Sequence, residues 1–202
     1  DLRPNGGAWP RIGLKETLEA LQQHPLWQNR AESKAKGRGL GIAIGGWPGG
    51  IEPATAICRL EADGTFTIVL GSVDLSGTNT TFAQIVAEEL GLDANDLRIV
   101  TAPTDSAPFA GGTGGSKITY TVGAAVKKAA EDTRLQILNI AAEQLEVSPD
   151  DLELSGGKIS VKGVPGSEMT LKEVAGLSLS TANEHEPVLG RGSSSITESA
   201  PG

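Results

Sequence analysis

The 202-residue chain is poor in cysteine and aromatic residues, with one cysteine, one tyrosine, three tryptophans and three phenylalanines. A chain of this length can bury a core without covalent staples, and its single cysteine, Cys58, excludes an intramolecular disulfide. No apolar run approaches the ~20 residues of a membrane helix, and the first residues lack the basic and apolar stretches of a signal peptide. The sequence therefore predicts a cytoplasmic protein without membrane insertion.

Basic residues are also scarce, since 17 Lys and Arg face 25 Asp and Glu, for a net charge of -8. Affinity for nucleic-acid phosphates comes mostly from clustered Lys and Arg, so we expect no nucleic-acid partner. His24 and His185 lie far apart, and no Cys/His cluster has metal-ligand spacing. The sequence therefore predicts no direct protein ligand to a metal ion.

Glycine, by contrast, is abundant at 27 residues, which implies many turns or close backbone approaches. Between the glycine-rich segments, apolar periodicity predicts secondary structure. Strand-like patterns occupy residues 40–44, 54–60, 65–70 and 97–102. Ala62-Asp63-Gly64 predicts a hairpin between residues 54–60 and 65–70, and a second hairpin is expected at 152–161. Helical patterns occupy residues 11–30 with a break at Pro25, 82–90 ending at Gly91, 119–146 and 169–175.

This order of elements predicts an α+β fold, with helices packed on one face of a mixed β-sheet in two layers. Three regions are expected. Residues 1–36 form an N-terminal helical segment and linker, residues 37–177 form the α+β domain, and residues 178–202, rich in Ser, Glu, Pro and Gly, form an irregular tail or interdomain linker.

Two loops, residues 71–80 and 111–117, each lie between a predicted strand and the start of a predicted helix. Exposed N–H groups and the helix dipole favour an anionic ligand at such a place. Both loops consist mainly of small residues, which would let a phosphate or an amide-rich heterocycle approach the main chain. The pattern is therefore typical of a ligand-binding site.

Alternatives remain for these loops. A Walker motif is excluded because Ser116 separates Gly115 from Lys117, and a dinucleotide motif because Lys117 stands where a third glycine is needed. Ordinary turns with helix caps are the other interpretation. In that case the caps would come from Thr78 or Asn79 in the first helix, and from Ser116 or Thr119 in the second.

The spacing of residues between these loops matches one known pattern. The stretch from Gly71 to Ala130 resembles the second molybdopterin-binding domain of the xanthine dehydrogenase and aldehyde oxidase family. The matching motifs are Gly71-Ser72-x-Asp74, Gln84-Ile85-x-Ala87-Glu88-x-Leu90-Gly91, Thr104-Asp105-x-x-Pro108, Gly112-Thr113-x-Gly115-Ser116-x-x-Thr119 and Gly123-x-Ala125-Val126-x-x-Ala129-Ala130.

The resemblance implies a molybdenum–molybdopterin cofactor, with the cytosine dinucleotide form among those it allows. It implies that the first loop contacts the pterin through Ser76, Gly77 and Thr78. It also implies that the second loop approaches the molybdenum through the main chain of Thr113, Gly114, Gly115 and Ser116, and that Gly46 and Trp47 lie near the substrate channel.

Two departures from the family pattern stand out. The family's Gly-Gln-Gly is Ser76-Gly77-Thr78 here, so a glutamine side chain is missing, and the arginine after Gly-Ser is Lys117, which lacks the planar guanidinium. The family's catalytic glutamate and its Gly-Phe-Gly-Gly loop have no match, so we expect no catalytic residue in this chain.

Turnover would then require the remaining domains of the large subunit, an iron–sulfur subunit and an FAD subunit. We therefore expect the chain by itself to be inactive as a hydroxylase. A non-catalytic binding or scaffold module that keeps the fold without the cofactor is one alternative. A phosphate-binding enzyme of unrelated type is the other.

Overall fold

The computed structural model describes residues 12–45, 50–182 and 184–195. These residues fall into two compact units, one ending at Gly45 and the other beginning at Gly50. No helix within the described ranges combines the length and apolarity needed to cross a membrane.

The first unit contains three short helices, α1 (Leu14–Gln22), α2 (Pro25–Gln28) and α3 (Arg30–Ala35), and none of them buries a residue. The predicted break at Pro25 is confirmed, because this proline begins α2, where its fixed φ suits the first helical turn. The predicted strand at residues 40–44 is wrong. Leu40, Ile42 and Ile44 alternate with small residues as in a strand, but their side chains are exposed. A segment with this pattern forms a β-strand only when a neighbouring strand accepts and donates its backbone hydrogen bonds.

The second unit is built on a four-stranded sheet with the order β3-β2-β1-β7. Strands β1 (Pro53–Leu60) and β2 (Phe66–Leu70) form the predicted antiparallel hairpin, and β3 (Leu97–Thr101) runs parallel to β2. β7 (Leu189–Ser195) pairs antiparallel with β1. The sheet is therefore mixed, as predicted.

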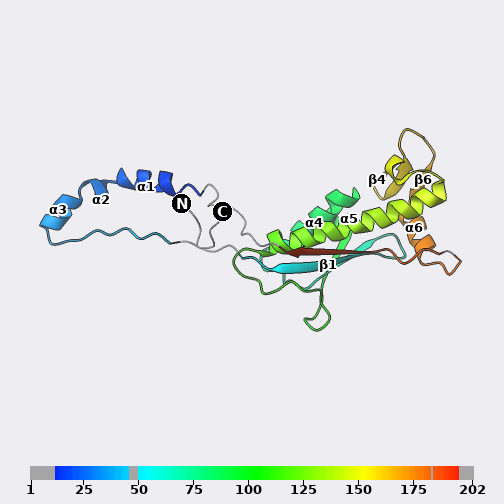
Figure 1. Ribbon diagram of the computed structural model, residues 1–202, viewed down its shortest axis with the longest axis horizontal. Coiled ribbons are helices and arrows are strands. Elements are labelled where there is room, and N and C mark those ends of the chain that lie inside the picture. Colours follow the sequence, from blue (N-terminus) through cyan, green and yellow to red (C-terminus); the bar gives the residue numbers. More distant parts are fainter. Residues whose placement is uncertain (1–11, 46–49, 183, 196–202) are drawn as a thin grey trace. The chain divides into compact units, whose positions relative to one another are not determined.

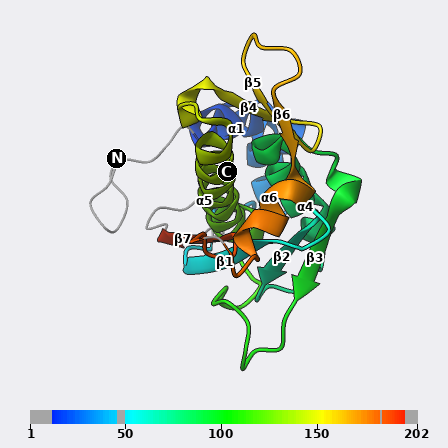
Figure 2. The ribbon, with the colours of Figure 1, turned by 90° about the vertical axis from the view of Figure 1, so that its right-hand side faces the viewer.

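Two helices cover one face of this sheet, α4 (Thr78–Leu90) and the longer α5 (Ile118–Leu145), as Figures 1 and 2 show. The predicted helix end at Gly91 is confirmed, because this residue is the left-handed C-cap of α4. Alternate strand residues and the facing helix stripes form the core, whose largest members include Phe66, Ile68, Leu70, Phe82, Val86, Leu90, Val122 and Val126. The two-layer α+β architecture is thus confirmed.

Strand β7 corrects the prediction of an irregular tail after residue 177. Its sequence, Leu-Gly-Arg-Gly-Ser-Ser-Ser, carries almost no apolar signal. The small residues are needed because α5 lies directly on the strand, and a Cβ added at Gly192 would overlap the carbonyl oxygen of Ala125. Gly190 meets α5 in the same way, at Ala129 and Thr133. The residues of β7 are therefore determined by the need for small side chains beneath α5 and not by hydrophobicity.

Helix α5 also closes the free edge of β7. Lys128, Asp132 and Gln136, spaced four residues apart on α5, bind backbone groups of alternate β7 residues. The Asp132 carboxylate accepts from the Arg191 N–H at 2.8 Å, and the Gln136 amide bonds both the N–H and the C=O of Leu189 at 3.0 and 3.1 Å. An exposed strand edge invites pairing with another chain, and here helix side chains occupy it.

A smaller antiparallel sheet follows α5, with β4 (Leu152–Ser155), β5 (Lys158–Val161) and β6 (Glu168–Thr170). The predicted hairpin at 152–161 is confirmed. The short helix predicted from residue 169 begins later, as α6 (Leu171–Ser178), because Thr170 and Glu173 form a capping box there. Two 3-10 turns, Ala94–Asp96 and Pro149–Asp151, precede β3 and β4.

Gly192→Ala tests the contact between β7 and α5. We expect this change to lower the free energy of unfolding by about 3 kcal/mol, since overpacking against a helix backbone cannot be relieved by a rotamer change. Urea denaturation measures it. Gly176→Ala in α6, where an added methyl meets nothing within 4 Å, is the control and should be neutral or slightly stabilising. Equal effects of the two changes would contradict the close-contact explanation.

Cys58 provides a second test, because its side chain is fully buried under α5 and burial raises the pKa of its thiol to about 11. We expect iodoacetamide at pH 8 to leave the native protein unlabelled and to label it in urea, followed by mass spectrometry. The pKa is raised on folding, so this thiol's contribution to stability is lost as pH rises from about 9 towards 11. Rapid labelling of the native protein would show that this part of the core opens readily.

Candidate functional site

The two glycine-rich loops leave the sheet at the same edge. Strands β2 and β3 are parallel, and their last residues, Leu70 and Thr101, are paired in register. The Ala102 N–H bonds the Leu70 carbonyl at 3.0 Å, and the Thr101 hydroxyl bonds the Ser72 carbonyl at 3.3 Å. Ligands of α/β sheets characteristically bind beyond such carboxyl ends.

The loops also contact each other beyond this edge. A Cβ added at Gly71 in the first loop would overlap the carbonyl oxygen of Pro108 in the second connection. The helices that follow the two loops pack through their early turns, where Gly123 of α5 faces Phe82 and Ile85 of α4. Both views show α4 and α5 side by side on the same face of the sheet (Figures 1 and 2).

The structure thus brings the predicted site residues of both loops, Ser76, Gly77 and Thr78 in one and Thr113, Gly114, Gly115 and Ser116 in the other, to one edge of the sheet. Their contact with a cofactor stays a prediction. The predicted channel residues Gly46 and Trp47 lie outside the described residues.

Neither helix at this edge is capped by a side chain. The N-cap positions are Gly77 of α4 and Lys117 of α5, so the caps expected from Thr78, Asn79, Ser116 or Thr119 are wrong. The first N–H groups of a helix have no acceptor within the helix, and they carry the positive end of its dipole. Two such ends next to each other favour an anionic ligand.

Two buried polar atoms in the first loop and helix lack a hydrogen-bond partner. They are the Ser72 hydroxyl and the Asn79 Oδ1 atom, the two such side-chain atoms found within the described residues. Ser72 is 1% exposed. A buried polar group without a partner costs about 1–3 kcal/mol and calls for an explanation, such as a ligand. Both atoms suit a heterocycle that carries N–H and C=O groups.

The second loop leaves its main chain open. A Cβ added at Gly112 or Gly114 would meet nothing within 4 Å, so a ligand could approach the backbone there. Ser116 is held at φ +55°, a conformation that costs a non-glycine residue about 1–3 kcal/mol and that recurs at functional sites. The backbone of the second loop is therefore strained at Ser116, next to the glycines whose main chain is open to a ligand.

An aspartate in a loop, such as Asp74 in the first loop, commonly bonds turn amides. Its Oδ1 atom accepts instead from the Thr78 hydroxyl at 3.3 Å, which links the loop to the first residue of α4. The side chains of Val73 and Leu75 beside it are 50% and 72% exposed, and Phe109 in the second connection is 58% exposed. These three apolar side chains are exposed on the two connections that follow β2 and β3.

Two residues shape the second loop, Lys117 and Glu52. Sequence reasoning noted Lys117 only as a replacement for the family's arginine, and it missed Glu52. The Lys117 side chain is only 4% exposed, and its ammonium group pairs with Glu52 just before β1. The family pattern drew attention to Lys117, whereas nothing in the local sequence marks Glu52 as its partner.

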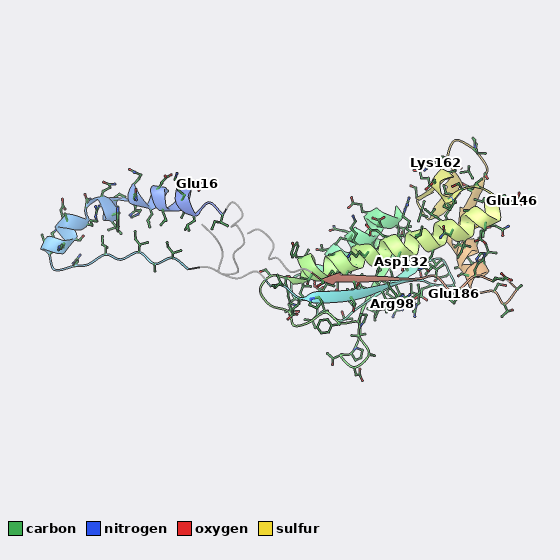
Figure 3. All side chains as sticks on the ribbon, viewed as in Figure 1. Glu16, Arg98, Asp132, Glu146, Lys162 and Glu186 are labelled. Atoms are coloured by element: carbon green, nitrogen blue, oxygen red, sulfur yellow. The ribbon has the colours of Figure 1, made fainter. Side chains whose placement is uncertain are left out.

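The structure also has two shallow hollows away from the two glycine-rich loops. A shallow hollow of about 420 Å³ is lined by Arg59, Asp63 and Arg98 beside the β1–β2 turn, and one of about 530 Å³ by Asn139 and neighbouring residues at the end of α5. Charged side chains such as Arg98, Asp132 and Glu146 are spread along the unit in Figure 3. Within the described ranges no three His, Cys, Asp or Glu residues could together hold a metal ion.

The paired loops, the two uncapped helices and the unsatisfied polar atoms give this α+β domain an edge whose features are typical of a site for an anionic heterocyclic ligand. The family model of the molybdopterin cofactor-binding domain matches residues 16–198, and the chain belongs to this family. The predicted resemblance to the molybdopterin-binding subunits of the xanthine dehydrogenase type is thereby confirmed.

Curated relatives agree with this assignment. The chain is 34% identical over 195 residues to the carbon monoxide dehydrogenase large chain of Afipia carboxidovorans, covering 85% of this chain and 24% of that protein. It is 33% identical over 176 residues to a putative xanthine dehydrogenase molybdenum-binding subunit of Escherichia coli, covering 81% and 23%. The chain therefore spans about a quarter of the length of these relatives.

Solved structures give the same result. The reconstituted CO dehydrogenase from Oligotropha carboxidovorans aligns with a TM-score of 0.66 and 28% identity, over 99% of this chain and 28% of that one. Quinoline 2-oxidoreductase from Pseudomonas putida aligns with a TM-score of 0.63 and 24% identity, over 93% and 26%, which shows the shared fold.

Ser72→Ala tests whether the buried hydroxyl is kept for a ligand. In the ligand-free protein we expect this change to raise the free energy of unfolding by about 1 kcal/mol, because it removes a buried polar atom that has no partner. The matched control is Ser194→Ala, whose buried hydroxyl donates to the Thr121 carbonyl at 2.7 Å and whose loss should destabilise by about 1 kcal/mol. Destabilisation of similar size in both variants would rule out the idea.

Proposed function

We propose that this chain holds the molybdenum–molybdopterin cofactor of a larger molybdenum hydroxylase, at the sheet edge from which its two glycine-rich loops leave. The main support is that two uncapped helix N-termini and two unsatisfied buried polar atoms occur at this one edge. The family match supplies the identity of the ligand.

In this proposal the first loop binds the pterin side of the cofactor. The N–H groups at the start of α4, with Ser76, Gly77 and Thr78, bind its anionic substituents, because the helix dipole is positive there. The Ser72 hydroxyl and the Asn79 amide oxygen satisfy their missing hydrogen bonds with polar groups of the heterocycle. Burial of these two atoms keeps water from competing.

The second loop presents main-chain groups rather than side chains. Thr113, Gly114, Gly115 and Ser116 would face the metal end of the cofactor, because the absence of bulk at Gly114 leaves the backbone accessible. When bound, the molybdenum centre supplies two-electron oxidation chemistry with water as the source of oxygen. This chain binds and orients the group, and we assign the general base to another part of the subunit.

The proposal includes partners. The relatives are named as a large chain or a molybdenum-binding subunit, so each belongs to a larger assembly. We propose that further domains of the subunit cover the exposed Val73, Leu75 and Phe109, and that iron–sulfur and FAD subunits carry electrons away. A pterin in the cytosine dinucleotide form fits an edge with two helix N-termini, since such a tail adds phosphate charge.

A substrate channel near Gly46 and Trp47 is also part of the proposal, on the resemblance alone. A cytoplasmic location is supported by the sequence, where a single cysteine excludes intramolecular disulfides. The rival function is a scaffold module that keeps the fold without the cofactor. The feature that favours it is Ser76-Gly77-Thr78, which lacks the glutamine side chain of the family pattern.

Cofactor content separates the two functions. The complete molybdenum-binding subunit is purified from a molybdate-supplied host, with molybdenum measured by mass spectrometry and the oxidised pterin by its fluorescence. We expect one molybdenum and one pterin per chain. Asn79→Ala should lower the retained pterin about tenfold, which corresponds to one lost buried hydrogen bond.

Asn139→Ala is the matched control, because this exposed asparagine lies on α5 near its carboxyl end, away from the loops. It should leave pterin content unchanged. A wild-type subunit without molybdenum or pterin under these conditions would favour the scaffold. A cofactor-loaded subunit that is insensitive to Asn79→Ala would place the cofactor elsewhere.

A further inference from the structure

The residue before α5 makes an ion pair that the proposed function does not use directly. Lys117 is 4% exposed, and its Nζ atom donates to the Glu52 carboxylate and to the Ala110 carbonyl, the latter at 3.2 Å. Glu52 is 65 residues away in sequence and 43% exposed. Burying an ammonium group is expensive unless it is paired and hydrogen-bonded, and here both conditions are met.

The ion pair is one of three attachments between residues 109–117 and residues 50–55, which include the start of β1. The Gly50 N–H donates to the Gly115 carbonyl at 2.7 Å, and the Thr55 N–H donates to the Phe109 carbonyl, also at 2.7 Å. The loop is therefore attached before its glycine run, within it and after it. The link from Lys117 to the Ala110 carbonyl closes residues 110–117 into a ring.

The fit between the two segments leaves no spare room. Gly111 has φ +64°, and a Cβ added there would overlap the carboxylate of Glu52. A Cβ added at Gly50 would press against the Lys117 side chain and the Gly114 carbonyl. The ion pair and these close approaches together restrain the position of the loop relative to the segment before β1.

A buried ion pair seldom adds net stability over an apolar residue of the same size. The ion pair instead restrains the conformation of the chain. Because the Lys117 ammonium group is held by two acceptors, the position of Lys117 itself is restrained. Lys117 adjoins Ser116, the strained residue of the loop. Its restraint therefore sets how the N–H groups of residues 112–116 are presented.

We infer that Glu52 and Lys117 are positioning residues, which hold the loop of residues 111–116 in the conformation that presents its main-chain N–H groups to the cofactor. This inference rests on the proposed function for the identity of the ligand. The restraint on the loop itself is a property of the ligand-free chain.

Lys117→Met tests the restraint, since it removes the ammonium group, nearly preserves side-chain length and leaves Glu52 able to be hydrated. Hydrogen exchange of the Gly50 and Thr55 N–H groups, which donate to the Gly115 and Phe109 carbonyls, should become about tenfold faster when followed by mass spectrometry on the 202-residue chain. The melting temperature should change by no more than a few degrees, because the core is intact. Lys117→Arg, which keeps the charge, should restore slow exchange.

Glu168→Gln is the control, because Glu168 forms an exposed ion pair with Lys158 at 2.7 Å in the small sheet. It should alter neither hydrogen exchange at Gly50 and Thr55 nor the melting temperature. In the complete subunit, Lys117→Met and Glu52→Gln should each lower the retained pterin several-fold. Unchanged exchange in Lys117→Met, or faster exchange only together with a proportionate loss of melting temperature, would overturn the positioning role.

The two proposals can fail separately. If the wild-type subunit contains no pterin, the proposed function fails, while the exchange experiment still decides whether the ion pair restrains the loop. If the wild-type subunit contains pterin and both variants retain it in full with unchanged exchange, the inference alone fails.

Discussion

The direct contact of α5 with the sheet is the constraint on which the rest of the structure depends. Gly190 and Gly192 let the helix backbone touch β7, and Lys128, Asp132 and Gln136 then bind the outer edge of that strand. With the helix axis set in this way, Gly123 near the start of α5 packs against Phe82 and Ile85 of α4. The two loops before these helices consequently share one edge of the sheet.

At this edge the chain departs from what stability alone would favour. The helices lack side-chain caps, Ser116 adopts a strained conformation, and the Ser72 and Asn79 oxygens are buried without partners. Proteins commonly break local rules where they bind or react. The unmet hydrogen bonds and positive helix ends together describe a ligand with negative charge and many polar atoms, which agrees with the molybdopterin family to which the chain belongs.

Much of the fold could be predicted because its signals are local. The β1–β2 hairpin follows from Ala62-Asp63-Gly64, and α4 follows from its apolar stripe and the glycine that ends it. The errors arose where tertiary contacts replace local signals. β7 has no apolar pattern because α5 demands small residues there, and residues 40–44 have the pattern of a strand without a neighbour.

By itself, the sequence determined the family, the α+β class and the two loops, because spaced motifs and apolar periodicity are written in consecutive residues. Only the tertiary structure decided that β7 belongs to the sheet, that the helices at the site are uncapped and that Glu52 meets Lys117. The β1–β7 pairing and the Glu52–Lys117 ion pair connect residues that are 65 or more positions apart in the sequence. The caps depend on how the helix ends pack in the folded domain. No local pattern encodes them, since each exists only once the chain has packed.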